Sequence, residues 1–149
     1  MNKIHIKLAQ AHENQSKNFD VRREIKEIQE YCNLTEIKLE AESINLMCLR
    51  GDYDNFQKAT KVVFVFINYI GKTIKELHGD IRIYVDNEKV QFAKTTIDFD
   101  ENFMGNLQCN EGMLVHLNIP TRGLSEDKSF KTKDLEVQFT DVRVTYVNE

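Results

Sequence analysis

The chain has 149 residues, and its 24 acidic side chains outnumber the 20 basic ones, which gives a formal net charge of −4. One domain of this size buries about two thirds of its unfolded surface on folding. Hydrophobic residues make up 41% of the chain and include nine Phe and five Tyr, so a core is expected and a disordered chain is excluded. The longest apolar run, residues 62–67, is much shorter than the roughly 18 residues of a membrane-spanning helix.

The distribution of charges and cysteines narrows the class of protein further. The chain has no basic stripe interleaved with aromatic residues, so nucleic acid is not an expected ligand. Its three cysteines have no C-x-x-C spacing, which favours reduced, buried thiols over disulfides or a zinc site. Because the N-terminus as written has no secretory signal, we expect a cytoplasmic protein, or an extracellular one if an export segment was removed.

Only one segment of the chain has helical periodicity. Apolar residues recur at the spacing of a single helix face at Val21, Ile25, Ile28 and Cys32. This pattern predicts a helix over about 20–32, with Asp20 capping its first amides and Asn33 ending it in the left-handed conformation. A helix with so narrow an apolar stripe is expected to cover an edge or an open end of the surrounding sheets.

The first half of the chain outside this helix has the alternation of β-strands. A short strand is expected over residues 4–8, and another over 37–41, whose phase then shifts at 44–48 through a bulge or a break. Residues 61–70 are apolar on both faces, which predicts a central strand covered on both sides. Between these strands, Arg50-Gly51-Asp52 is expected to form a tight turn.

The second half continues as strands. We expect a hairpin over 80–93, a strand that ends at Pro120, and two alternating runs near the C-terminus joined by a bulge near Asp141. Strands spaced in this way predict a mainly β, antiparallel immunoglobulin-like sandwich with one N-terminal helix. The whole chain, 1–149, is then a single domain, in which 1–50 supply a strand, the helix and a strand, and 60–149 form the sandwich core.

A stretch that crosses the middle of the chain resembles a known family. The residues are Phe64-Val65-Phe66-Ile67-Asn68, Gly71-Lys72-Thr73-Ile74 and the run from Gly79 to Asp86, with Tyr84 shortly before that Asp. This order of strand, Asn, Gly-Lys-x-Ile, Gly and aromatic strand resembles bacterial immunoglobulin-like domains of the FxLYD type, over about residues 60–149. The chain differs from them at Asn87, where a turn glycine is common. The resemblance implies a binding or spacer module without catalytic residues.

The sequence offers few candidates for catalysis or cofactor binding. The four histidines are scattered, no G-x-S-x-G motif accompanies them, and the six glycines are isolated rather than gathered in a phosphate-binding loop. His116 stands between Val115 and Leu117, so an alternating strand points it away from their face. We therefore expect no enzyme and no cofactor.

Acidic and aromatic residues in predicted loops supply the candidate sites. Asp98, Asp100 and Glu101 are interpreted as a solvated loop, so no metal is expected, with a calcium site as the alternative. Tyr53, Asp54, Asp100 and Phe103 are the candidate contact residues for a protein partner.

Three functions are compatible with the sequence. The first is a non-enzymatic protein-interaction module that uses edge strands or end loops, and an edge strand can also pair with its copy to form a homodimer. The second is a small acidic inhibitor or immunity-type protein that blocks an enzyme, because the last third of the chain carries most of the negative charge. The third is an enzyme with an unrecognised site.

Overall fold

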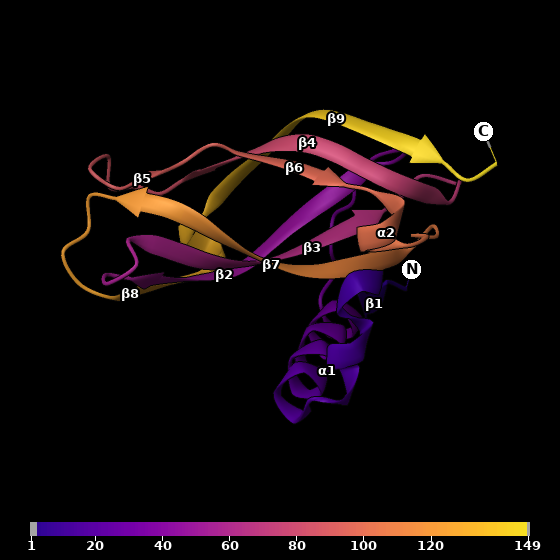
Figure 1. The fold of residues 1–149 in the computed structure, drawn as a ribbon, viewed down its shortest axis with the longest axis horizontal. Coiled ribbons are helices and arrows are strands. Elements are labelled where there is room, and N and C mark those ends of the chain that lie inside the picture. Colours follow the sequence, from indigo (N-terminus) through magenta and orange to yellow (C-terminus); the bar gives the residue numbers. More distant parts are fainter. Residues whose placement is uncertain (1–2, 149) are drawn as a thin grey trace.

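The computed structural model describes residues 3–148 as two β-sheets packed face to face, with one long helix against the outer side of the larger sheet (Figure 1). The expectation of a mainly β sandwich with one N-terminal helix is confirmed. In chain order the elements are β1 (His5–Leu8), η1 (Gln10–Lys17), α1 (Phe19–Leu34), β2 (Ile44–Asp54), β3 (Ala59–Asn68), β4 (Ile74–Tyr84), β5 (Gln91–Phe92), β6 (Thr95–Phe99), α2 (Glu101–Met104), β7 (Glu111–Arg122), β8 (Lys128–Lys131), η2 (Thr132–Asp134) and β9 (Glu136–Tyr146).

The strands form one large and one small sheet. The large sheet has the order β1-β7-β3-β2-β8, with β5 added to the last residues of β7, and the small sheet has the order β6-β4-β9. The named strand pairs are antiparallel except β1 and β7, which run parallel. After β8 and η2 the chain leaves the large sheet, and β9 pairs with β4 in the small one.

Strand β3 lies in the middle of the large sheet and is covered on both faces, as its sequence predicts. On the inner face, Phe64 and Phe66 are fully buried against residues of the small sheet such as Leu77. On the outer face, Val65 and Ile67 are fully buried in a second cluster, which the helix completes with Ile28. Each face of this strand therefore requires its own apolar cover.

Helix α1 differs from its prediction in its ends and in its position. It starts at Phe19 because the extended Asn18 before it is the cap, with Oδ1 accepting from the amides of Asp20 (2.8 Å) and Val21 (3.2 Å). Asn33 does not end it: the helix runs to Leu34, and the capping residue Thr35 is extended at φ −109°. The helix covers the outer face of the large sheet rather than an edge or an open end, because that face is itself apolar.

The expected strand at 37–41 is absent, because these residues belong to a non-repetitive segment, 35–43, that crosses the outer face. In place of a neighbouring strand, the side chain of Asn45 satisfies the backbone of Glu40. Its Oδ1 accepts from the Glu40 amide (2.8 Å) and its Nδ2 donates to the Glu40 carbonyl (3.0 Å). Arg50-Gly51-Asp52 is not a turn either. It lies inside β2, paired with β3 on one side and β8 on the other.

In the second half, the expected hairpin at 80–93 is wrong because its two arms join different sheets. After β4 the chain turns, and the Val90 amide donates to the Asn87 carbonyl (3.0 Å) in this turn. The chain then crosses to the large sheet, where β5 pairs with β7. Strand β7 continues past Pro120 to Arg122, and the Pro120 carbonyl accepts from the Ala93 amide (2.9 Å). The predicted bulge is confirmed, since the β4–β9 register shifts beside Asp141, whose φ is 52°.

These packing relations predict the response to core truncation. Phe66→Ala removes a fully buried ring that contacts Phe99 and Phe139 at centroid distances of 5.3 and 5.8 Å. We expect the free energy of unfolding to fall by about 3–5 kcal/mol, measured by urea denaturation. The matched control is Phe56→Ala, at a ring that is 95% exposed, with an expected change within about 0.5 kcal/mol. Equal losses in the two variants would contradict the assigned core.

Candidate functional site

The four candidate contact residues from the sequence do not form one surface. Tyr53 is only 3% exposed, so its ring belongs to the core and is not available to a partner. The exposed Asp54 stands at the β2–β3 hairpin, whereas Asp100 and the half-buried Phe103 belong to α2, at the opposite end of the sandwich (Figure 1). Asp100 caps α2 by accepting from the Phe103 amide (2.9 Å). A partner cannot contact all four residues through one compact site.

The three carboxylates of the calcium candidate do not converge. Asp98 lies on β6, and its Oδ1 is 2.8 Å from Nδ1 of His78 on β4. Asp100 is occupied as the cap of α2, and Glu101 is the first residue of that helix. Within residues 3–148, no group of three His, Cys, Asp or Glu side chains is placed to hold a metal ion. The described structure therefore does not bring the three carboxylates of this candidate together.

A charged cluster does form where α1 meets the outer face of the large sheet. Glu24 of α1 lies with Oε1 2.7 Å from Nε2 of His116 on β7 and with Oε2 2.8 Å from a guanidinium nitrogen of Arg50 on β2. The Glu24 side chain is 13% exposed, while those of its two partners are 36% and 54% exposed. One carboxylate thus joins the helix to two strands of the sheet.

The electrostatics of this cluster favour the ionised carboxylate. The hydrogen bond with His116 lowers the pKa of Glu24, and the charges of Arg50 and Lys61, with that of His116 when it is protonated, lower it further, although partial burial opposes them. A charge-assisted bond of this kind is stronger than one between neutral groups. The cluster therefore fixes the position of α1 over β2 and β7.

Sequence reasoning found only part of this cluster. The alternation predicts that His116 points away from Val115, and it does: Val115 faces the inner core while His116 meets the helix. Its partner could not be predicted, because Glu24 is 92 positions away in the sequence. The one clue was the place of Glu24 beside the apolar stripe of a helix.

Beside the cluster, the first half of β2 pairs with β3 along one edge, but within residues 3–148 no strand pairs with its opposite edge. Strand β3 pairs with β2 from Ile44 to Asp54, but β8 pairs with it only from Arg50 to Tyr53. The side chain of Thr132 closes the end of this gap by donating to the Leu49 carbonyl (2.7 Å). We call residues 44–49 of β2 the open edge.

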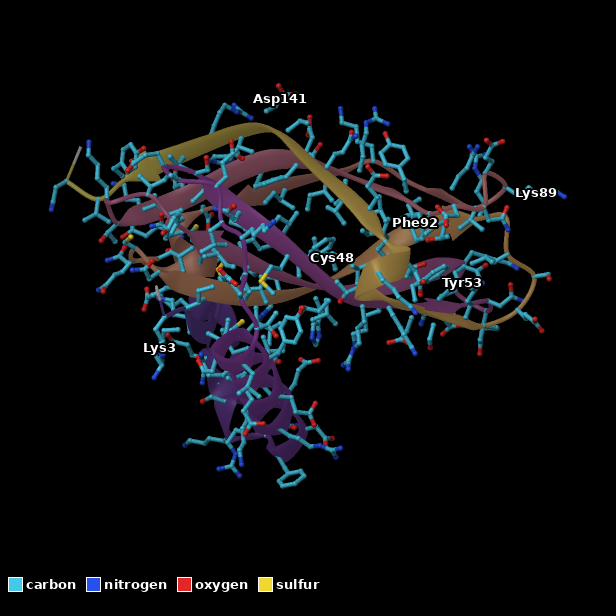
Figure 2. All side chains as sticks on the ribbon, turned by 180° about the vertical axis from the view of Figure 1, so that it is seen from behind. Lys3, Cys48, Tyr53, Lys89, Phe92 and Asp141 are labelled. Atoms are coloured by element: carbon cyan, nitrogen blue, oxygen red, sulfur yellow. The ribbon has the colours of Figure 1, made fainter. Side chains whose placement is uncertain are left out.

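A groove of about 320 Å³ follows this open edge. One wall is the end of α1 with the segment after it, and the other is formed by η2 and the start of β9. Cys48, labelled in Figure 2, lines the groove from β2. The lining residues include Tyr31, Ile37, Leu46, Met47, Leu135 and Val137. A second cavity, of about 210 Å³, adjoins it under Glu24 and Tyr31. Thr35, Glu36 and Thr132 also line the groove, so apolar side chains on its floor and on both walls stand beside polar ones.

Two of the cysteines lie near these cavities, and burial makes both of them poor nucleophiles. Burial raises the pKa of Cys48 to about 12. Burial also raises the pKa of Cys32, which lines a larger cavity of about 630 Å³ on the other side of residues 35–43. The thiolate is the reactive form, and burial disfavours it at both positions.

Comparisons with protein-family models, with curated proteins and with solved structures gave no match. In the described part of the chain, no helix is both long enough and apolar enough to cross a membrane.

The cluster predicts a pH-dependent contribution to stability. Because the folded pKa of Glu24 lies below its unfolded value, ionised Glu24 stabilises the fold above that value, near 4.5, and the stabilisation is lost as the pH falls through the folded pKa. We expect Glu24→Gln to cost about 1–2 kcal/mol at pH 7, by chemical denaturation, and progressively less below pH 4.5.

The control for this prediction is Glu27→Gln on the same helix. Glu27 pairs with Arg23 at 3.1 Å, but both side chains are more than half exposed, so the expected loss is within about 0.5 kcal/mol at any pH. A Glu24→Gln loss that is equally small, or that stays constant down to acidic pH, would show that the cluster does not hold the helix.

Proposed function

We propose that this protein is a non-enzymatic protein-interaction module that binds its partner along the open edge of β2. The observation that carries the proposal is the coincidence of an unpaired strand edge with an apolar groove. Natural proteins usually cover such edges, because the free backbone groups and apolar side chains are ready to associate. An edge left open between two apolar walls is thus a site prepared for another chain.

The burial of the edge supports this proposal. Ile44, Asn45, Leu46 and Met47 are all half-buried, although each neighbours the fully buried strand β3. Contact with a partner would remove the remaining apolar surface from water, at about 25 cal/mol for each Å². The edge can therefore contribute binding energy without any change in the sandwich.

The inhibitor alternative places the contact elsewhere. An acidic inhibitor would bind through its exposed carboxylates, and its association rate would fall steeply with salt. Binding in the groove depends mainly on apolar burial and on backbone hydrogen bonds, which salt screens much less.

The test compares capture by the wild-type chain with capture by two edge variants. Leu46→Pro places a ring where an amide faces the open side, and Ile44→Pro does the same at the first residue of β2, where proline is best tolerated. A stoichiometric partner captured from the native host, then purified and mixed again, should bind each folded variant at least about tenfold more weakly. Phe56→Ala, on the distant β2–β3 hairpin, should bind normally.

Circular dichroism and urea denaturation first establish which edge variants are folded. Undiminished binding by a folded edge variant would contradict the proposal. Binding that is lost in roughly 0.5 M salt, where charges are screened within a few Å, but unchanged by the edge variants would favour the acidic inhibitor instead.

A further inference from the structure

We propose that the partner supplies an extended segment that joins the large sheet as an additional strand beside Ile44–Leu49, with apolar and basic side chains alternating along it. This inference rests on the proposed function and specifies its mode and the class of partner. Strand addition is an established form of peptide recognition, in which main-chain hydrogen bonds supply affinity and side-chain pockets supply specificity.

The direction of the backbone groups supports an extended occupant. At the start of the β2–β3 ladder, the Tyr69 amide donates to the Ser43 carbonyl (3.0 Å). In an antiparallel ladder the bonded and non-bonded positions alternate, so residues 45 and 47 exchange hydrogen bonds with β3. The amides and carbonyls of Ile44 and Leu46 must then face the open side. Among protein segments, another extended backbone is the one that matches such a row of groups.

The open edge differs from the other edges of the sandwich in how it is protected. The edge of β1 is occupied by Gln29 of α1, whose Oε1 accepts from the Ile6 amide (2.8 Å) and whose Nε2 donates to the Ile4 carbonyl (2.7 Å). The edge strand β9 carries a bulge and Asp141, and β8 begins and ends with lysine. Bulges and lysines are devices that prevent edge pairing.

The open edge carries no lysine, and its one irregularity is the register shift against β3 between Cys48 and Arg50, at the end of the gap. Residues 44–49 read Ile-Asn-Leu-Met-Cys-Leu, without a charge, a proline or a glycine. The closing contact of Thr132 with the Leu49 carbonyl and the start of β8 pairing at Arg50 limit the gap to about these six residues. An added strand of five or six residues fits this length.

The charges on the two walls determine the charge of the occupant. Residues 35–43 carry Glu36, Glu40, Glu42 and Lys38, and residues 132–137 carry Lys133, Asp134 and Glu136. These two segments carry five acidic side chains against two basic ones, and Glu36 among them lines the groove. The positive charge of the nearby Arg50 is already paired with Glu24 at 2.8 Å. Complementarity with Glu36 therefore favours lysine or arginine among the side chains of the added strand.

The experiment selects peptides from a random nine-residue display library on the full wild-type chain. Counter-selection uses the Leu46→Pro variant, or Ile44→Pro if the first does not fold. We expect enriched peptides in which apolar residues alternate with Lys or Arg. A synthetic peptide of the enriched sequence is then N-methylated at every second residue, in each of the two registers.

The two N-methylated forms are the decisive comparison. In an added strand, alternate amides donate to β2 and the others face solvent. N-methylation in one register should therefore weaken binding at least about tenfold, while N-methylation in the other register should change it less than about twofold. Equal effects in both registers, enrichment of acidic sequences, or no enrichment at all would overturn strand addition.

These results are distinguishable from a failure of the proposed function. If the captured partner still requires the edge but N-methylation has no register dependence, the groove is the binding site and strand addition is wrong. If folded edge variants retain the partner in full, both proposals fail. A dimer of this chain that the edge variants dissociate would show that a second copy, not a basic segment, occupies the edge, and would also overturn the inference.

Discussion

The structure depends on the need to cover β3 on both faces. Residues 62–67 are apolar at every position, and all of them are at most 3% exposed. A strand of this kind cannot lie in a sheet that faces water on one side. The small sheet covers its inner face, and α1 with the segment after it covers its outer face. The helix is therefore part of the core of the protein rather than an addition to a finished sandwich.

The position of the helix has a consequence for the edges of the large sheet. With Gln29, α1 satisfies the backbone of β1, and with Glu24 it is attached to β7 and β2. Helix α1 covers the outer face of β2 but does not cover the open edge. On the side opposite β3, β9 pairs with β4 instead, and β2 has no second strand neighbour before Arg50. The same chain path that completes the core thus leaves one uncharged edge beside an apolar groove.

The parts of this fold that periodicity determines could be predicted from the sequence. The alternation of strands predicted a mainly β sandwich, the apolar run predicted β3, and a phase change predicted the bulge at Asp141. The segment around Ile37 and Leu39 was misread because its apolar residues pack on the sheet without pairing with a strand. Alternation reports which side of a segment is buried, but it does not report whether the backbone has a neighbour.

The candidate site could not be predicted for a related reason. Pairings such as Glu24 with His116, or Thr132 with Leu49, join residues far apart in the sequence and depend on how the sheets are ordered. The sequence contains the uncharged run 44–49, but nothing in that run shows that β8 stops short of it. The contact residues proposed from loop composition do not share one surface, because Tyr53 is a core residue and α2 lies at the other end of the sandwich.

The measurement that tests the central claim most directly is amide hydrogen exchange of β2, resolved by residue, in the free protein and in its complex with the captured partner. The account predicts that the Ile44 and Leu46 amides exchange rapidly in the free protein, while those of residues 45 and 47 are protected by β3. Binding should slow exchange at Ile44 and Leu46 alone among these four. Slow exchange at both positions in the free protein, or rates that the partner leaves unchanged, would contradict the claim that this edge is the binding site.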